Sequence, residues 1–435
     1  MRKFFLDTFF ITLFVFAVMW GIQGISNLNI FNALDPISQS LEDTELTDYA
    51  FSSLRVEDPM IDTNIVIVNV GYLSREMIGR QIELLSALKP KVIALDILFA
   101  CDGGLRDSIN CPEAYDTLGN LVFGKAVRNT PNMVMAHKLW QTKEMRQINT
   151  AVMDSLEHSD EELRINADEG FVNLFTDADH QEDLKICRKF YPTMDVNGKR
   201  HLAFSVMASM LYDSVKTNKF LSRKNEIEIV NYRGNIIDWH GASTYPGRYF
   251  VLDWYQALDT ASFVHGMIKD KIILMGFLGS DLSDTSWDDK FFTPLNKKFG
   301  GRARPDMYGP VVHANIISMI MNEDYVEELE PWHKYLFSIL ICYINVALFW
   351  YIFRKIPVFF DVGSLSLQLV QLVAFVLLIP YTFYWYKVKL DITLGLTTLA
   401  LAGPCFEIYM SIIVLGVKNL RKLWLTKRQK QVLTP

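Results

Sequence analysis

Four long apolar segments set the tightest limit on what this 435-residue chain can fold into. A helix needs about 20 mostly apolar residues to cross the hydrocarbon core of a bilayer, and each segment is close to that length or longer. One lies near the N-terminus and three follow one another near the C-terminus. The predicted spans are residues 4–25, 335–353, 365–386 and 392–417.

The composition separates a membrane part from a water-exposed part. Hydrophobic residues make up 50% of the chain, which is high for a soluble protein, and they concentrate in the four segments. The long stretch between the first two segments has an ordinary globular composition, which predicts a large domain outside the membrane. The net charge is −6 and the chain after Gly416 is basic, so the globular part is more acidic than the total. An acidic domain does not favour nucleic-acid binding.

The basic residues beside the spans predict the orientation in the membrane, because cytoplasmic loops carry an excess of Lys and Arg. If both termini are cytoplasmic, most of the basic residues beside the spans are cytoplasmic as well. Lys387 and Lys389, in a short outer loop, are a weak signal against this orientation. Residues 27–332 then lie outside the cytoplasm, which for the inner membrane of a bacterium means the periplasm. The residues assigned to the cytoplasm are Arg2, Lys3, Arg354, Lys355, Lys418, Arg421, Lys422, Lys427, Arg428 and Lys430.

The predicted domains follow from these spans. They are an N-terminal anchor of residues 1–26, an outer domain of 27–332, three membrane helices within 333–417 and a basic cytoplasmic tail of 418–435. The first segment also resembles a signal peptide. We expect an uncleaved anchor, because the segment is long enough to span and no small-x-small cleavage site follows it.

The outer domain has the sequence pattern of an α/β fold. Residues 92–99 form an apolar run that only Asp96 interrupts, which is typical of a strand buried on both faces of a parallel sheet. Residues 65–70 form a similar run, and the segment between the two has helical periodicity. Strand, helix and strand predict a βαβ unit. Residues 271–279 predict a further core strand, so we expect a mostly parallel central sheet flanked by helices.

The remaining elements are predicted with weaker patterns. We expect helices over 118–128 and 202–215, and strands over 133–137, 170–174 and 227–233. We also expect a charged surface helix or excursion over 143–164, an exposed strand over 185–194 and a short extended piece running into a helix from Tyr308. Residues 29–59 predict a helical lead-in with an acidic face formed by Asp43, Glu45, Asp48, Glu57 and Asp58.

Several segments together resemble one known family, and their order and spacing agree across most of residues 30–330. The segments are Ile65-Val-Ile-Val-Asn-Val70, Lys89-Pro-Lys-Val-Ile-Ala-Leu-Asp-Ile-Leu-Phe99, Asn231-Tyr-Arg-Gly234, Lys271-Ile-Ile-Leu-Met-Gly276, Asp284 with Thr293-Pro294, and Tyr308-Gly-Pro-Val-Val-His-Ala-Asn315. The chain resembles bacterial proteins with the second type of CHASE domain (cyclase/histidine-kinase-associated sensory extracellular). One span, an outer domain and three further spans agree with that family as well.

The resemblance implies an outer domain that senses an extracellular cue and signals through the last three helices. In the family the signal reaches a cytoplasmic output such as a cyclase, a kinase or a response module. Here only a short basic tail follows Gly416, so we expect the chain to act through separate partner proteins. The resemblance does not imply a particular ligand.

Polar residues near the ends of the predicted strands are the candidate ligand-binding residues: Asp96, Asp281, Asp284, Asp288 and His313. They predict a cation or a small polar ligand held where two strands end. The alternative is structural, with Asp96 capping backbone amides of a turn and His313 a hydrogen-bonded buried group. Their spacing fits no calcium loop, and no phosphate loop or catalytic motif occurs, so no cofactor, metal ion or catalytic residue is predicted.

Two further sets of residues remain open. Cys101 and Cys111 predict either a disulfide in an oxidising compartment or two free thiols, with Cys187 unpaired. Glu407 lies in the fourth predicted span, and Gln368 and Gln371 of the third span face it in this hypothesis. An intramembrane carboxylate indicates a proton or helix-contact site, and the alternative is a hydrogen-bonded packing contact.

These observations favour a membrane-anchored sensor without enzymatic activity. It would bind an unknown small molecule or protein and pass its state through the C-terminal helices to protein partners or to further copies of itself. The alternative is a non-catalytic docking subunit of a cell-envelope complex. A third hypothesis is a transport component that uses Glu407.

Overall fold

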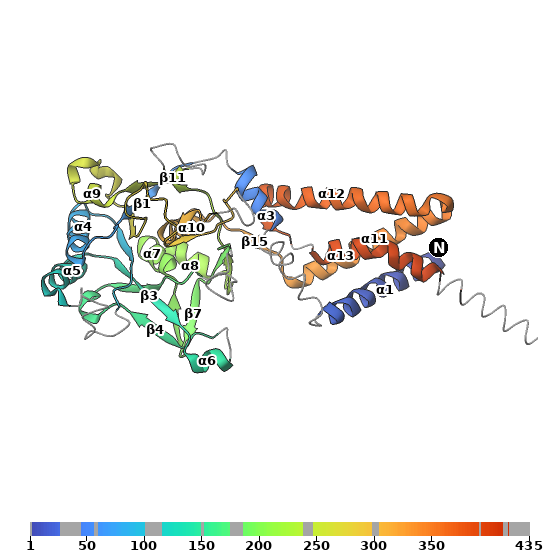
Figure 1. Ribbon diagram of the computed structural model, residues 1–435, viewed down its shortest axis with the longest axis horizontal. Helices are drawn as coiled ribbons and strands as arrows, with labels where there is room; N and C mark the ends of the chain where they lie inside the picture. The colour runs from blue at the N-terminus through green and yellow to red at the C-terminus, as the bar shows by residue number, and fades with distance from the viewer. Residues whose placement is uncertain are drawn as a thin grey trace, which may run out of the picture. The chain divides into compact units, whose positions relative to one another are not determined.

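The computed structural model describes residues 2–26, 45–55, 60–100, 115–148, 152–174, 186–237, 247–297, 304–390, 393–411 and 416. The chain divides into two compact units. Residues 48–326 form one unit, and residues 1–47 and 327–435 form the other. Their elements are labelled in Figure 1.

An eight-stranded sheet forms the centre of the 48–326 unit. The strands lie in the order β10-β11-β1-β12-β2-β3-β4, and β5 also pairs with β3. Within the described residues every pair in this sheet is parallel except β3 with β4, which confirms the predicted α/β sheet. The strands are β1 (Asp62–Asn69), β2 (Val92–Asp96), β3 (Met133–Trp140), β4 (Ser155–His158), β5 (Asp168–Phe171), β10 (Asn235–Ile236), β11 (Gly247–Leu252) and β12 (Ile272–Gly276).

Helices cover both faces of the sheet, which explains why its central strands are apolar without alternation. α4 (Arg75–Ala87) and α5 (Thr117–Asn129) pack on the face that carries Val66, Ile93 and Met275. Alternate residues of the same strands point to the opposite face, where α7 (Phe204–Tyr212) and α10 (Gly309–Met321) contact the sheet. The core is therefore split into two layers by the sheet.

β12 lies between β1 and β2, although β1 and β2 are joined directly along the chain by α4. Asn69, Gly276 and Asp96 are partners across these three strands. Because all three strands are parallel, their carboxyl ends meet at one edge of the sheet, the edge where open α/β sheets bind ligands. This edge contains residues that are far apart in the sequence.

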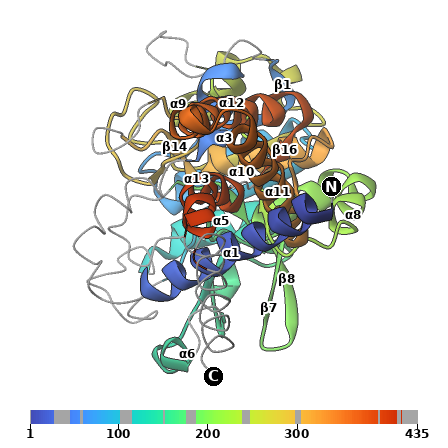
Figure 2. The same ribbon diagram turned by 90° about the vertical axis from the view of Figure 1, so that its right-hand side faces the viewer.

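Shorter elements complete the unit. β7 and β8 form an antiparallel hairpin, visible in Figure 2. The others are α3 (Leu46–Tyr49, at the boundary of the unit), η2 (Ala50–Leu54), α6 (Lys143–Ile148), η4 (Glu161–Leu163), β6 (Lys189–Phe190), β7 (Thr193–Val196), β8 (Lys199–Leu202), α8 (Ser214–Leu221), β9 (Glu228–Ile229), α9 (Trp254–Ala257), η5 (Thr260–Ser262), η6 (His265–Met267), β13 (Lys290–Phe291) and β14 (Met307–Tyr308).

Three predictions for this unit are wrong in detail. Residues 143–164 hold α6 followed by β4, which joins the sheet antiparallel at its edge. Residues 227–233 form only the two-residue strand β9, because Asn231 and Arg233 make side-chain contacts instead of a ladder. Asp48 does not lie on an exposed acidic face; it is buried and forms an ion pair with Arg188. Asp43, Glu57 and Asp58 lie outside the described residues.

The second unit is a group of apolar helices. α1 (Arg2–Ser26), α11 (Pro331–Lys355), α12 (Phe360–Tyr386) and α13 (Thr393–Ile408) pack around a core that includes Val15, Phe349 and Phe406. η7 (Pro357–Phe359) precedes α12, and β15 (Glu327–Glu328) pairs with β16 (Val388–Lys389).

Three helices of this unit are long and apolar enough to cross a membrane: Phe4–Ile22, Trp332–Lys355 and Pro357–Tyr386. They correspond to the first three predicted spans, and the third begins earlier than expected. The fourth span, residues 392–417, stays a prediction. α13 covers 16 of its residues, and residues 392, 412–415 and 417 lie outside the described part of the chain.

Candidate functional site

Asn69 organises the loops at the carboxyl edge of the sheet. It is the last residue of β1 and is fully buried. Its Nδ2 donates to Asp253 Oδ1 at 2.9 Å and to the Gly279 carbonyl at 3.2 Å, and its Oδ1 accepts from the amides of Gly71 and Leu278. One amide side chain therefore ties the loop after β12 to the ends of β1 and β11. This role was not predicted, although Asn69 is the one polar residue of the apolar run 65–70.

Asp96 occupies the same edge, as the last residue of β2. Its side chain is 14% exposed, and its Oδ2 lies 3.8 Å from Nε2 of His313. Burial and, to a smaller extent, repulsion by Asp289 raise the pKa of Asp96 to about 8, while Lys138 acts in the opposite direction. The Asp96 carboxyl accepts no hydrogen bond from any described residue, so the predicted capping role for it finds no partner there.

The start of α10 lies against Asp96. A Cβ placed on Gly309 would be 3.6 Å from Asp96 Oδ2 and 3.9 Å from Asp289 Oδ2, so two carboxylates approach the helix start. A Cβ on Gly276 would be 2.5 Å from Pro310 Cγ, so the end of β12 and the first turn of α10 are in direct contact. Glycine at position 276 permits this close approach.

His313 extends the site from the first half of α10. The side chain is 2% exposed and packs edge-on against Phe204, with 5.2 Å between the ring centroids. Burial lowers the pKa of His313 to about 3, with the Val172 backbone acting in the opposite direction, so the imidazole is neutral at neutral pH. Its Nδ1 has no hydrogen-bond partner among the described residues. His313 is thus not the fully hydrogen-bonded group of the structural alternative.

The predicted residues of the following loop form turns. Asp281 Oδ1 accepts from the Ser283 amide at 2.8 Å, and Asp284 accepts from the amides of Ser280 and Ser286, both at 2.7 Å. These hydrogen bonds hold the pKa of Asp284 well below its usual range. No hydrogen bond or ion pair links Asp281, Asp284 or Asp288 to Asp96 or His313 within the described residues. The structure brings together Asp96 and His313, and adds Asp289 and Lys138, which the sequence analysis did not select.

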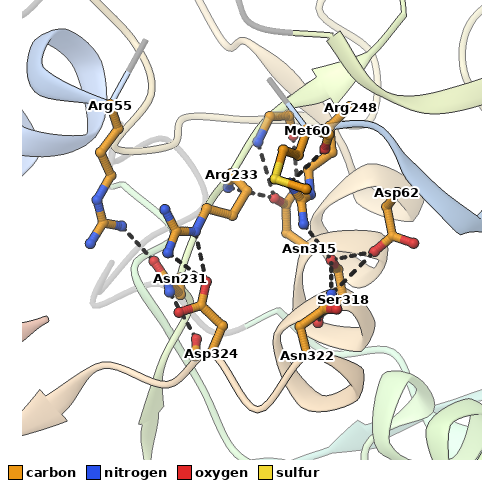
Figure 3. A network of polar contacts seen from close by, with 11 residues as sticks. Arg55, Met60, Asp62, Asn231, Arg233, Arg248, Asn315, Ser318, Asn322 and Asp324 are labelled. Carbon is orange, nitrogen blue, oxygen red and sulfur yellow. Dashed lines mark hydrogen bonds and ion pairs between the residues drawn. The ribbon is translucent and has the colours of Figure 1, made fainter. Parts of the chain in front are cut away.

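A polar network lies at the other end of α10 (Figure 3). The Arg233 guanidinium donates from both Nε and Nη2 to Asp324 Oδ2, at 2.8 and 2.5 Å, and Asn231 donates to the Asp324 carbonyl at 2.8 Å. Arg55 donates to Asn231 Oδ1 at 2.5 Å. Asn315 accepts from the Arg233 amide and donates to the Gly234 carbonyl. The segment 231–234 thereby connects α10, the chain entering this unit and the chain leaving it.

A second part of the network fixes the last turns of α10 to β1. Ser318 Oγ donates to Asp62 Oδ2 at 2.6 Å, and Asn322 Nδ2 approaches the same oxygen at 3.4 Å. Arg248 of β11 donates to Ser318 Oγ at 3.2 Å. Figure 3 shows Asp62, Ser318 and Asn322 pointing toward one another. The C-terminal half of α10 is therefore held by polar groups of other elements.

The other predicted residues give mixed outcomes. Gln368 donates to the Leu399 carbonyl of α13 at 2.8 Å, while Glu407 is exposed on α13 and makes no hydrogen bond or ion pair with a described residue. Gln371 Oε1 is buried and, in the described part of the chain, unpaired. Cys187 is a buried free thiol. Cys101 and Cys111 lie outside the described residues.

Comparison with known proteins identifies the family of this fold. The family model described as CHASE2 domain matches residues 28–351, well over half of the chain. The chain matches no curated protein and no solved structure. The match includes the central sheet, both ends of α10 and the start of α11. The chain is therefore a membrane protein that belongs to the CHASE2 domain family, a family of sensory extracellular domains.

Proposed function

We propose that this protein is a membrane-anchored sensor in which a cation or small polar ligand binds beside Asp96, and α10 transmits the bound state toward the membrane helices. One observation supports this most directly. All 13 residues of α10 are buried; the helix begins against Asp96 and Asp289 and ends three residues before Asp324. At about 1.5 Å per residue, the helix spans about 20 Å between the two ends.

The charge at the strand ends favours a cationic group. Carboxylate oxygens of Asp96 and Asp289 both lie within 4 Å of the position that a Cβ on Gly309 would take, and the pKa of Asp96 is raised to about 8 by burial and by Asp289. A bound cation stabilises ionised carboxylates that desolvation and mutual repulsion otherwise destabilise. Binding would therefore deprotonate Asp96 and change the contacts of Gly309, Pro310 and His313. The ligand then binds the two states of this site with different affinity, and coupling between two sites requires such a difference.

The packing of α10 makes it suited to transmit that change. A helix buried on every side moves as a body, because close-packed interiors do not deform continuously. Asn315 links the helix to Arg233 and Gly234, and Ser318 links it to Asp62. A shift at Gly309 therefore reaches the Arg233–Asp324 ion pair, from which the chain continues into β15 and α11.

The membrane arrangement in this proposal follows from the spans and the basic residues. Residues 27–332 are periplasmic, four helices cross the inner membrane, and both termini are cytoplasmic, as the basic residues Arg354 and Lys355 favour. The protein signals to separate partner proteins or to a second copy of itself through the helices of residues 333–417.

Hydrogen exchange on the full chain in detergent tests the coupling without a known ligand. Asp96→Asn imitates the neutral carboxyl, and Asp281→Asn is a matched control because, among the described residues, the Asp281 side chain bonds within its own turn. At one fixed pH near 9, where wild-type Asp96 is largely ionised, we expect Asp96→Asn to change exchange at residues 322–330. The control is expected to leave these residues unchanged. Unaltered exchange there in Asp96→Asn rules out transmission by α10.

The ligand class is tested by thermal unfolding of the same samples. Probes are inorganic monovalent and divalent cations and small primary amines. A ligand that binds only the folded state raises the midpoint in proportion to ln(1 + [L]/Kd). We expect at least one probe to stabilise the wild type and the Asp281→Asn control but not Asp96→Asn. Equal stabilisation of all three chains by every active probe contradicts binding at Asp96.

A further inference from the structure

Three side chains from three strands converge at the edge of the sheet beyond β3. His137 lies on β3 and is the cross-strand partner of His158 on β4, while Glu169 on β5 is the partner of Met135. Cross-strand partners share a face of a sheet, and so do residues two apart on one strand. His137, His158 and Glu169 therefore all project from the same face.

The donor atoms of these three residues lie within 4.8 Å of one another. His158 Nδ1 and Glu169 Oε1 are already 2.9 Å apart. Around a tetrahedral zinc ion, with bonds of about 2.0–2.2 Å to nitrogen and oxygen, neighbouring donor atoms are about 3.4 Å apart. Closing the remaining separation takes a movement of about an ångström, which side-chain rotation supplies without a change of strand register.

His137 provides an independent sign that something is bound here. Its side chain is 1% exposed, and neither ring nitrogen has a hydrogen-bond partner among the described residues. Buried polar groups are nearly always paired in native proteins, and an exception calls for an explanation such as an ion. A metal bond to one nitrogen satisfies the ring on the side that faces His158 and Glu169.

A third histidine adjoins the site. The ring of His201 on β8 is 5.5 Å from that of His137, with an angle of 69° between the two planes. His201 Nε2 is also buried and unpaired in the described part of the chain. The buried His137 and the half-buried His201, each with an unsatisfied ring nitrogen, thus lie together beside His158, which contacts a carboxylate.

Glu169 is held in place by an outer partner. Arg164 Nη1 donates to Glu169 Oε2 at 2.8 Å, and Arg164 Nε donates to the Ser159 carbonyl at 3.1 Å. This leaves Oε1 directed at His158. Partners of this kind orient the ligands of metal sites and are needed for full affinity. Without an ion the same residues still form a His158–Glu169–Arg164 ion-pair network, but that network leaves His137 without a hydrogen-bond partner among the described residues.

We propose that His137, His158 and Glu169 bind a divalent transition-metal ion of the zinc type. Two imidazole nitrogens and one carboxylate oxygen suit Zn²⁺ and its first-row neighbours, whereas Ca²⁺ and Mg²⁺ take oxygen ligands almost exclusively. Three protein ligands leave a coordination position open. The ion connects β3 to both β4 and β5, so it stabilises the antiparallel edge of the sheet. This inference does not depend on the sensor function proposed above.

Metal analysis of the full chain tests the proposal. The protein, freed of any affinity tag, is stripped with a chelator in detergent, dialysed against Zn²⁺ and measured by elemental analysis and by competition with a chromophoric chelator. We expect about one tightly held Zn²⁺ per chain, and a Co²⁺-loaded form with the visible absorption of a four- or five-coordinate nitrogen–oxygen site. His158→Asn and Glu169→Gln are the main variants, because both side chains are partly exposed and their loss disturbs packing little.

We expect each of these variants to lose Zn²⁺ affinity because each lacks a direct metal ligand. The loss should exceed the roughly 10- to 100-fold loss that follows removal of a residue that only orients a ligand. His137→Asn should do the same if it folds. His265→Asn is the matched control: His265 is exposed, lies on η6 and contacts the Thr260 carbonyl. We expect it to bind Zn²⁺ as the wild type does. Absence of stoichiometric Zn²⁺ from the wild type, or unchanged affinity in both His158→Asn and Glu169→Gln, overturns the proposal.

Discussion

Arg233 and Asp324 form a two-donor ion pair, in which Nε and Nη2 of the arginine bond to the same carboxylate oxygen at 2.8 and 2.5 Å. Arg233 belongs to the Asn231-Tyr-Arg-Gly234 segment, and Asp324 follows α10 on the way to the membrane helices. The pair therefore joins a loop of the 48–326 unit to the segment through which the chain leaves that unit. It gives that segment of the family pattern a structural role.

Replacing Arg233 by lysine is expected to weaken this junction. Lysine cannot present two donors in a planar fork, and both partners are mostly buried, with side chains 25% and 19% exposed. We expect the free energy of unfolding to fall by about 1–3 kcal/mol, the contribution of a charge-assisted hydrogen bond. We also expect proteases to cleave the chain faster on the C-terminal side of Asn322. Arg200→Lys is the control, because Arg200 and Asp195 form an exposed pair whose loss should change the unfolding midpoint little. Equal effects of the two substitutions would argue against a special role for Arg233.

The stability of the outer unit is expected to fall as pH rises, because of Asp96. The folded state keeps the proton until about pH 8, whereas the unfolded chain loses it near 3.8. Between these values the folded state holds more protons, so stability falls with pH, by at most about 1.4 kcal/mol per unit. The charges facing Asp96 are Asp289 and Lys138, and His313 is neutral there.

Asp96→Asn should make the fall of stability between pH 5 and 8 shallower, and the contribution of Asp306, whose pKa burial raises to about 7, should remain. The measurement is the thermal midpoint of wild type and variant at several pH values in that range. Asp281→Asn should retain the wild-type slope, since Asp281 lies in a turn and bonds to Ser283. Parallel curves for wild type and Asp96→Asn would show that the pKa of Asp96 is not raised.

Gly276→Ala tests the contact between β12 and α10. The new Cβ would lie 2.5 Å from Pro310 Cγ and 3.3 Å from Asp96 Cβ, so the helix start must move. Overpacking of this kind costs about 1–3 kcal/mol, which chemical denaturation of the full chain can measure. Gly266→Ala is the matched control, because no described residue beyond its chain neighbours comes within 4 Å of the added Cβ, and it should change stability far less.

Asn69→Ala is expected to lower the free energy of unfolding strongly, although the substitution removes only a few atoms. It leaves the amides of Gly71 and Leu278 without their partner and removes one of two hydrogen bonds to Asp253 Oδ1. Each buried group left unpaired costs about 1–3 kcal/mol, so the loss should exceed that of an exposed asparagine. Asn225→Ala provides the comparison, because Asn225 is exposed and donates one hydrogen bond to Glu228. A smaller effect at Asn69 than at Asn225 would contradict this account of the loop.

The local patterns were sufficient to predict most of the fold. The apolar runs of β1, β2 and β12 predicted buried parallel strands, and the three long apolar helices were predicted as membrane spans. Such elements depend on backbone hydrogen bonding and on the burial of near neighbours in the chain, which composition and periodicity report directly. The misplaced elements were β4 and the 227–233 segment, whose structure depends on neighbours elsewhere in the fold.

The sequence alone determined the fold class and the family, and it selected Asp96 and His313, which the structure places beside each other and whose ligand-binding role stays a prediction. Only the tertiary structure placed β12 between β1 and β2, brought Arg233 to Asp324, and gathered His137, His158 and Glu169, for which no ligand spacing had predicted a metal site. Asp281 and Asp284 were grouped with Asp96 because they follow a strand, but they bond to their own turn. The physical reason is that side-chain contacts between distant segments follow from strand order and register. Strand order and register are decided by burial in the whole core, and no single stretch of sequence contains that information.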